Sequence, residues 1–279
     1  MTVGRAAFAL ALLCAVAGAA AGSAQQPGNA RSRGAQGAPS QCVVCHGRLG
    51  DSTGAGHGFA AWRGSPHAVA GVACVACHGG NASAGDAATA HQGVRPSRDP
   101  ASPVFFTSIP NTCGRCHAAE AGYFRTSLHF ARLESDGRGP NCVTCHGSMA
   151  TSVLTAERLL ATCSACHVEG GVAPPEKARE AARVLALVQA ENVLYDVVSS
   201  EAAARRGSRG AARAAVLLGD AQRHLSAAAE VWHSFLLDSA AARLQDARQT
   251  MVEAWEALGH PAPSASIIHR APRSGATGR

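Results

Sequence analysis

Five copies of one short pattern, Cys-x-x-Cys-His, lie between residues 42 and 167 and constrain this chain more than any other feature. The cysteines are Cys42, Cys45, Cys74, Cys77, Cys113, Cys116, Cys142, Cys145, Cys163 and Cys166, and the histidines are His46, His78, His117, His146 and His167. Two cysteines at this spacing can form thioethers with the two vinyl groups of one haem, and the next histidine then lies beneath the iron as an axial ligand. We therefore predict five covalently bound haem c groups.

Other uses of paired cysteines fit this pattern less well. Structural disulfides need no histidine after each pair. Zinc sites built from four cysteines consume the pairs two at a time, and five pairs leave one over. Thioredoxin-like redox pairs accompany alternating strands and helices, and that pattern is absent from this sequence.

The composition agrees with an interior that is partly filled by something other than protein. Hydrophobic residues make up 47 % of the 279 residues, but aromatic residues only 4 %, and much of the remainder is alanine, which buries little surface. With about 25 residues for each motif, the haems must pack against one another. The net charge of +6 nearly matches the negative charge expected on five such haems. The sequence contains no long basic run, so nucleic acid is not an expected partner.

The N-terminus has the features of a secretory signal. Arg5 supplies a positive charge, residues 6–21 are apolar, and the small residues 22–24 predict cleavage after Ala24. An uncleaved N-terminal anchor is the alternative. Cleavage removes Cys14, the one cysteine outside the motifs. We expect a periplasmic protein, because bacteria attach haem c outside the cytoplasm.

The sequence predicts a mainly α chain without a regular sheet. After the signal (1–24) and a flexible leader (25–40), residues 41–170 form a compact multihaem c-type region of short helices and long loops. Residues 171–260 form a hairpin or bundle of long helices, and residues 261–279 form a mobile tail.

The long helices are predicted over residues 176–206 and 211–258, the second with a break at Gly219-Asp220, since aspartate is a good N-cap. The second stretch has two apolar faces that change over near His233, so we expect its halves to pack against different layers. The candidates for these layers are the haem region, the hairpin and a second subunit. A second subunit would make the protein a homo-oligomer. The faces consist of Leu217, Ala221, Leu225, Ala228, Trp232 and Phe235, and of Leu237, Leu244, Met251, Trp255 and Leu258.

A low-spin haem needs a second axial ligand, and histidines outside the motifs are the candidates. His67 and His129 share a Ser-x-His form, and His91 follows the second motif. On the predicted helix, His233 lies at the changeover, whereas His224 lies in an apolar stripe, where a buried histidine needs a partner. His57 and Met149, four residues after Cys145, remain open as ligands, and His260 and His269 are assigned to the tail. For every one of these residues the alternative is an ordinary surface or core role.

Six segments around the motifs carry a resemblance to a known family. They are Ser65-Pro66-His67, Gly71-Val72-Ala73-Cys74, Cys77-His78-Gly79-Gly80, Ala90-His91-Gln92-Gly93, Ser127-Leu128-His129 and Cys145-His146-Gly147. Over residues 41–170 the chain resembles the exported multihaem cytochromes c, the group of the nitrifier tetrahaem cytochrome, hydroxylamine oxidoreductase and pentahaem nitrite reductase. Its C-terminal part is similar to the helix bundle of the oxidoreductase members.

The resemblance implies closely packed haem pairs, in which a Ser-x-His histidine ligates a haem other than the adjacent one and a helix histidine such as His233 reaches back to a haem. The chain departs from the catalytic members of the group. It has no CxxCK motif, and its tyrosines are only Tyr123 and Tyr195, whereas hydroxylamine oxidoreductase has a cross-linked tyrosine. Relatives with a Cys-His-Gly-x-His run carry a histidine where this chain has Met149.

These features predict an electron-transfer protein, which passes electrons through closely packed haems between redox partners. The expected partners are a quinol-oxidising membrane protein or a periplasmic reductase. The alternative is a multihaem oxidoreductase, with one open haem that acts on a small nitrogen or sulfur species. A third hypothesis is a docking subunit, which would bind a redox partner through the C-terminal helices.

Overall fold

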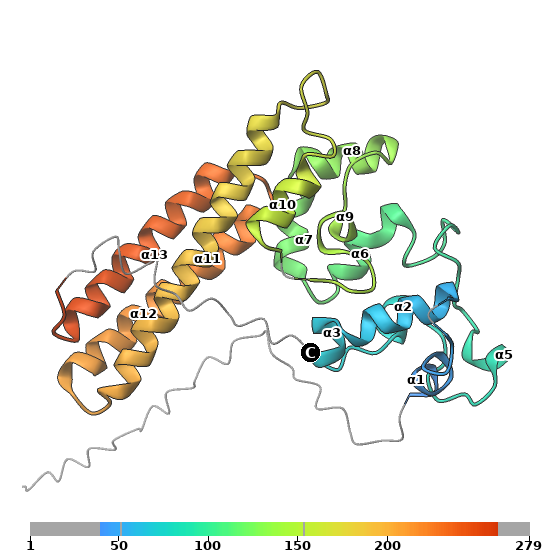
Figure 1. The fold of residues 1–279 in the computed structure, drawn as a ribbon, viewed down its shortest axis with the longest axis horizontal. Coiled ribbons are helices and arrows are strands. Elements are labelled where there is room, and N and C mark those ends of the chain that lie inside the picture. Colours follow the sequence, from blue (N-terminus) through green and yellow to red (C-terminus); the bar gives the residue numbers. More distant parts are fainter. Residues whose placement is uncertain (1–39, 51, 153, 262–279) are drawn as a thin grey trace, which may run out of the picture. The chain divides into compact units, whose positions relative to one another are not determined.

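A computed structural model describes residues 40–50, 52–152 and 154–261 (Figure 1), without the side chains of Ala55 and His57. The predicted signal sequence, nearly all of the leader and most of the tail, with His269, lie outside these residues. The described chain is helical and contains no strand, so the prediction of a mainly α chain is confirmed. No helix in this part of the chain has both the length and the apolar character needed to cross a membrane.

The motif region consists of short helices joined by loops. Two motifs form helices in full, α1 and α9, and α4 holds most of another, whereas Cys113 and Cys163 end α6 and α10. The helices are α1 (Gln41–His46), α2 (Gly54–Arg63), α3 (Pro66–Val69), α4 (Val75–His78), α5 (Ala87–Ala90), the 3-10 turn η1 (Phe106–Ser108), α6 (Ile109–Cys113), α7 (Ala118–Arg125), α8 (Leu128–Asp136), α9 (Cys142–His146) and α10 (Ala156–Cys163).

Few hydrophobic side chains of this region are buried. Within the described part of residues 40–170 they are Ile109, Ala121, Phe124, Leu133, Leu154 and Leu159, of which the last two belong to the core of the C-terminal helices. A domain of this length normally buries more than half of the surface that its unfolded chain exposes.

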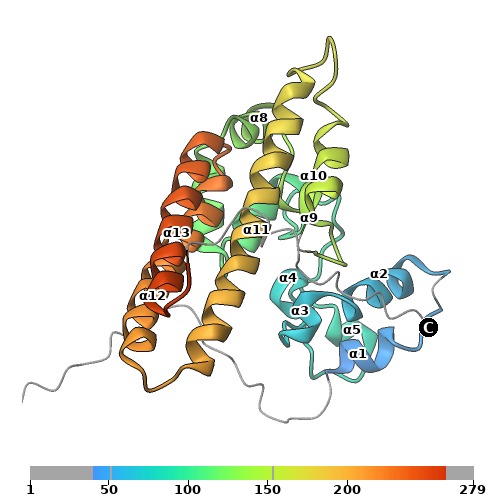
Figure 2. The same cartoon turned by 60° about the vertical axis from the view of Figure 1, so that its left-hand side comes forward.

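The C-terminal part contains three long helices, α11 (Pro175–Ala204), α12 (Arg209–Trp232) and α13 (Leu237–Ala257). They pack side by side in both views (Figures 1 and 2), with α10 against α11 and α7 against α12. The prediction of long C-terminal helices is confirmed.

The predicted break in the second helical stretch is wrong in position. Helix α12 runs through Gly219 and Asp220 and ends at Trp232, before a turn over residues 233–236. One glycine costs a helix only about 1 kcal/mol, which packing outweighs. Asp220 does not act as an N-cap, because its carboxylate pairs with Arg223 one turn along the same helix. The changeover of apolar faces near His233 marks the end of one helix and the start of the next.

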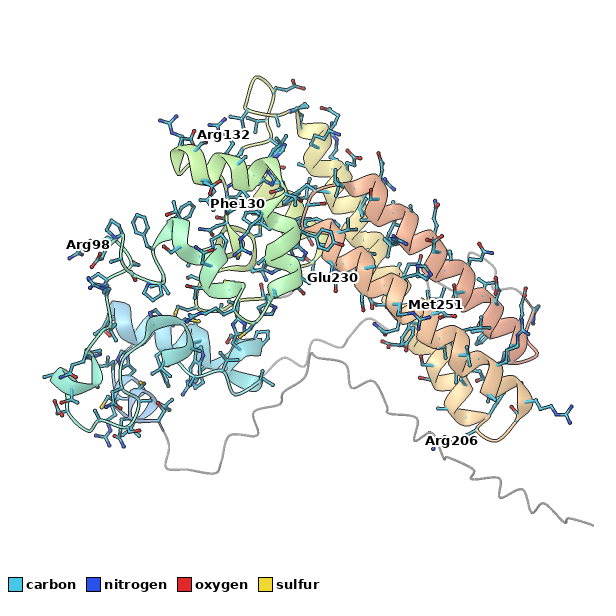
Figure 3. The ribbon with its side chains drawn as sticks, turned by 180° about the vertical axis from the view of Figure 1, so that it is seen from behind. Arg98, Phe130, Arg132, Arg206, Glu230 and Met251 are labelled. Atoms are coloured by element: carbon cyan, nitrogen blue, oxygen red, sulfur yellow. The ribbon has the colours of Figure 1, made fainter. Side chains whose placement is uncertain are left out.

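Alternating alanines and larger residues join α12 to α13 along a coiled-coil seam. The buried positions recur at spacings of three and four, as knobs-into-holes packing requires, and the alanines let the two backbones approach closely. They are Ala211, Ala214, Leu218, Ala221, Leu225, Ala228 and Trp232 on α12, and Leu237, Ala240, Leu244, Ala247, Met251, Ala254 and Leu258 on α13. Leu218 occupies the seam instead of the predicted Leu217. Met251, labelled in Figure 3, is fully buried, so of the three layers that the sequence allowed for this face the helices of the chain itself cover it.

An ion pair joins α11 to α13 beside this seam. The Nε and Nη2 atoms of Arg248 donate to Oε1 of Glu191 at 2.8 and 2.7 Å. Glu191 is only 2 % exposed, and its Oε2 has no hydrogen-bond partner in the described structure. Burial raises the pKa of Glu191, and the Arg248 guanidinium opposes that rise.

Replacing Arg248 with alanine should lower the free energy of unfolding by about 2 kcal/mol, because it leaves a buried carboxylate without its main donor. Denaturant unfolding of the holoprotein, followed by far-UV circular dichroism, measures the change. Arg243→Ala, at an exposed position of the same helix, is the control and should change stability by less than about 0.5 kcal/mol. Equal effects of the two variants would contradict the structural role of the ion pair.

Glu191 should also make stability depend on pH. Because its pKa is raised in the folded state, the folded chain binds more protons than the unfolded chain, and the contribution of Glu191 is lost as pH rises above its ordinary value of 4.5. The free energy of unfolding should therefore fall more steeply between acidic and neutral pH in the wild type than in Glu191→Gln. Parallel pH profiles for the two proteins would exclude this effect.

Candidate functional site

The five motifs lie next to one another in chain order. Adjacent thiols are close enough to influence each other's pKa, and for Cys145 burial and then the Cys163 thiol raise the pKa to about 11. Each motif thus lies near the one that follows it, from the first to the fifth. The neighbouring thiols are those of Cys42 and Cys74, Cys77 and Cys113, Cys113 and Cys142, and Cys145 and Cys163.

All ten motif cysteines are free, and each is partly or fully exposed. This is unusual, because free cysteine is among the residues that proteins bury most often. Adjacent motifs approach one another without forming a disulfide. The thiols are therefore accessible for a reaction with another group, as covalent haem attachment requires.

Four of the five motif histidines face a second histidine ring. An iron atom with bonds of about 2 Å to a nitrogen of each of two imidazoles would hold their ring centres about 6 Å apart. The observed distances between ring centroids agree with that value. The pairs are His46 and His91 at 6.1 Å, His117 and His67 at 6.0 Å, His146 and His233 at 6.3 Å, and His167 and His129 at 6.1 Å.

The second member of each pair is a histidine that the sequence predicted as a ligand. Each comes from a different part of the chain from the motif that it faces. His67 precedes the second motif but faces the histidine of the third, and His129 precedes the fourth motif but faces that of the fifth. His91 faces back to the first motif. This crossing pattern is the one that the family resemblance implies.

Hydrogen bonds fix the orientation of several of these rings. A carbonyl oxygen can only accept, so a ring Nδ1 bonded to one carries the proton and leaves the Nε2 lone pair for a metal. The Nδ1 atom of His67 is held instead by a hydroxyl, that of Thr151, at 3.0 Å. The carbonyl partners are Ala87 for His91 at 2.9 Å, Ser152 for His146 at 3.0 Å and Ala229 for His233 at 2.8 Å.

The protonation state of the rings also suits metal binding. Burial lowers the pKa values of His67, His78, His129 and His233. For His67 and His129, the opposed ring, His117 or His167, lowers the pKa further. A lowered pKa keeps imidazole neutral at neutral pH, which is the form that ligates a metal.

Haem fits these pairs better than a bare metal ion does. Zinc requires four ligands, of which at least three come from protein side chains. In the described part of the chain, no three histidine, cysteine, aspartate or glutamate side chains converge on one point. A porphyrin supplies four nitrogen ligands and leaves two axial positions, so an opposed pair of histidines is a complete protein contribution.

The turn between α12 and α13 adjoins two of the opposed histidine pairs. His233 faces His146, while the ring of Phe235 lies 4.2 Å from that of His129 at 89°. Phe235 has φ +61°, a conformation that is costly for an aromatic residue, by about 1–3 kcal/mol, and that persists where the surroundings impose it. In the His129–His167 pair both Nδ1 atoms are buried without a hydrogen-bond partner among the described residues, so packing by Phe235 orients this pair. No local sequence signal predicts that contact.

The sequence predicted two further roles, His224 as a haem ligand and His260 as part of the tail. His224 lies on α12 about 13 Å along the axis from His233, and its Nδ1 is 3.7 Å from a carboxylate oxygen of Asp246 on α13. Among the described residues no motif histidine ring faces His224, so its role as a haem ligand stays a prediction. His260 is not a free tail residue, because it stacks on Trp255 at 4.0 Å and bonds to Glu201 at 2.9 Å.

The second motif differs from the others. Among the described residues no second histidine ring faces His78. It lines a cavity of about 330 Å³ that the first two motifs share and to which Met149 contributes its side chain. The side chain of His57, the other open candidate, lies outside the described structure.

Comparison of the chain with known protein families, with curated proteins and with solved structures gives no match. The chemistry of the site therefore rests on its own geometry: free paired thiols, opposed imidazoles and a motif region with few buried hydrophobic side chains.

His233→Ala should convert one haem in five from low spin to high spin in the ferric holoprotein, because it removes one ring of an opposed pair. His224→Ala, on the helix that ends directly before His233, is the matched control and should leave the spectrum unchanged. Electron paramagnetic resonance measures both variants. A high-spin signal in His224→Ala, or none in His233→Ala, would contradict the assignment.

Proposed function

We propose that this protein is a pentahaem c-type cytochrome of the periplasm, which transfers electrons between redox partners through closely packed haems. The observation that carries the proposal is the set of four opposed histidine pairs, with ring centroids 6.0–6.3 Å apart. Each pair contains one histidine of a Cys-x-x-Cys-His motif and one from elsewhere in the chain. The row of free cysteines supports covalent attachment at each motif.

The paired histidines determine what such a centre does. A bound haem c supplies an iron that alternates between the ferric and ferrous states. Two opposed rings occupy both axial positions, so neither water nor substrate is bound there. Hydrogen bonds to Nδ1 hold the rings of His91, His146 and His233 in place, which limits rearrangement when the charge at the centre changes. This arrangement favours electron transfer over catalysis at four of the five motifs.

The order of the motifs supports a route through the protein. Each motif lies beside its successor, and neighbouring thiols contact or approach one another. Haems attached to such thiols form a row from the first motif to the fifth. The fourth and fifth motifs also adjoin the helix bundle, because Cys145 and Cys163 pack against its core.

The row of motifs suggests what kind of redox partners the protein has. A row with two ends can accept electrons at one and deliver them at the other. A quinol-oxidising membrane protein as donor and a periplasmic reductase as acceptor fit an exported chain of this kind. The signal sequence that would direct this export is part of the proposal.

One observation keeps an enzymatic function as the second candidate. His78 faces no other histidine among the described residues, so its haem is the one whose second axial position is not assigned to a histidine. An open iron there would suit an oxidoreductase acting on a small nitrogen or sulfur species.

The holoprotein, exported from a host that matures haem c, distinguishes the two functions. A carrier should accept five electrons in a redox titration, show no high-spin ferric signal and leave hydroxylamine, nitrite and sulfur oxyanions unchanged. His233→Ala serves as the positive control for the spectrum, since it opens one axial position by design. A high-spin signal from one wild-type haem in five, with turnover of one of these substrates, would favour the enzyme instead.

A further inference from the structure

The cavity between the first two motifs holds a side chain that the opposed histidines do not use. We infer that the thioether sulfur of Met149 is the axial ligand opposite His78, so that the second motif carries a histidine–methionine haem. This inference rests on the proposed function, because it requires haem at that motif. It assigns a ligand to the one motif histidine that has no opposed ring.

Elimination leaves His78 as the position to be filled. The other four motif histidines each face a second histidine ring. His224 is beside Asp246, and His260 is held by Glu201 and Trp255. Met149 follows the fourth motif in sequence, but His233 already opposes the histidine of that motif. If Met149 ligates an iron, it must therefore be that of another motif.

The cavity brings Met149 to the second motif. Met149 and His78 line the same space of about 330 Å³, together with Phe59 and both rings of the His46–His91 pair. Because that pair already has two opposed rings, His78 is the motif histidine of this cavity that lacks one. Met149 lies against α2 where Gly58 has no side chain: its Cγ and Cε would be 3.7 and 3.8 Å from a Cβ added at that glycine. Among the residues that line this cavity, Met149 is the one thioether. An uncharged, polarizable sulfur suits such a largely apolar space.

The loop that carries Met149 is fixed on both sides. It begins at Gly147, whose φ of +81° favours glycine. It ends where the Ser152 carbonyl accepts a hydrogen bond from His146 and the Thr151 hydroxyl bonds to His67, both at 3.0 Å. Both contacts are with histidines of opposed pairs. One six-residue loop thus positions two opposed histidines, and Met149 lies between its two fixed ends.

A methionine ligand would change the properties of the row. Methionine opposite histidine raises the reduction potential of a haem above that of a haem with two histidines. The second haem would then be the site where the first electron resides after partial reduction. Its iron would be six-coordinate and closed to substrate, which removes the structural basis of the enzymatic alternative.

Near-infrared magnetic circular dichroism of the ferric holoprotein tests the inference, because histidine–methionine ferric haem has its charge-transfer band at a longer wavelength than bis-histidine haem. The wild type should show this longer-wavelength band for one haem in five. Met149→Leu should lose it and gain one high-spin haem. Met149→His should lose it, remain low spin and lower the highest of the five potentials. Met251→Leu is the matched control, since this buried methionine lies in the seam of the bundle and its replacement by leucine conserves volume; it should retain the band.

A wild-type protein with five haems but without the band would overturn the inference and leave the proposed function standing. So would a band that survives in Met149→Leu, or a low-spin haem that is lost in His57→Ala but not in Met149→Leu. A protein whose intact mass shows no attached haem would instead overturn the proposed function, so the two failures are distinguishable.

Discussion

The opposed imidazole rings are the interaction on which the motif region depends. Each pair joins two segments that are distant in sequence, and the ring centroids lie 6.0–6.3 Å apart. Such a gap is wide enough for one metal atom that accepts a lone pair from each ring. Under the proposed function an iron atom would occupy it, and the porphyrin would add apolar material to the interior.

The two parts of the chain are therefore stabilised differently. The C-terminal helices form a conventional core, in which alanines alternate with larger residues along the seam of α12 and α13. The motif region buries few hydrophobic side chains. The turn at residues 233–236 connects the two parts, because His233 there faces His146 and Phe235 packs on His129.

Much of this arrangement follows from the sequence. The motif spacing pointed to the cysteines that the structure leaves free and places beside one another. The Ser-x-His segments pointed to His67 and His129, which the structure places opposite motif histidines. The break between α12 and α13 was misplaced, because an N-cap signal at Gly219-Asp220 is local, whereas the change of apolar face at His233 reflects packing. Proximity of His224 to Asp246, and of Met149 to the second motif, arises from tertiary contacts that no local pattern encodes.

The pairing of ligands is the central claim, and anomalous diffraction at the iron absorption edge from crystals of the holoprotein tests it most directly. The account predicts five iron positions in a row that follows the order of the motifs. Four of them should lie midway between the rings of the opposed histidine pairs. Iron positions away from these pairs, or crystals of the mature chain without iron, would contradict it.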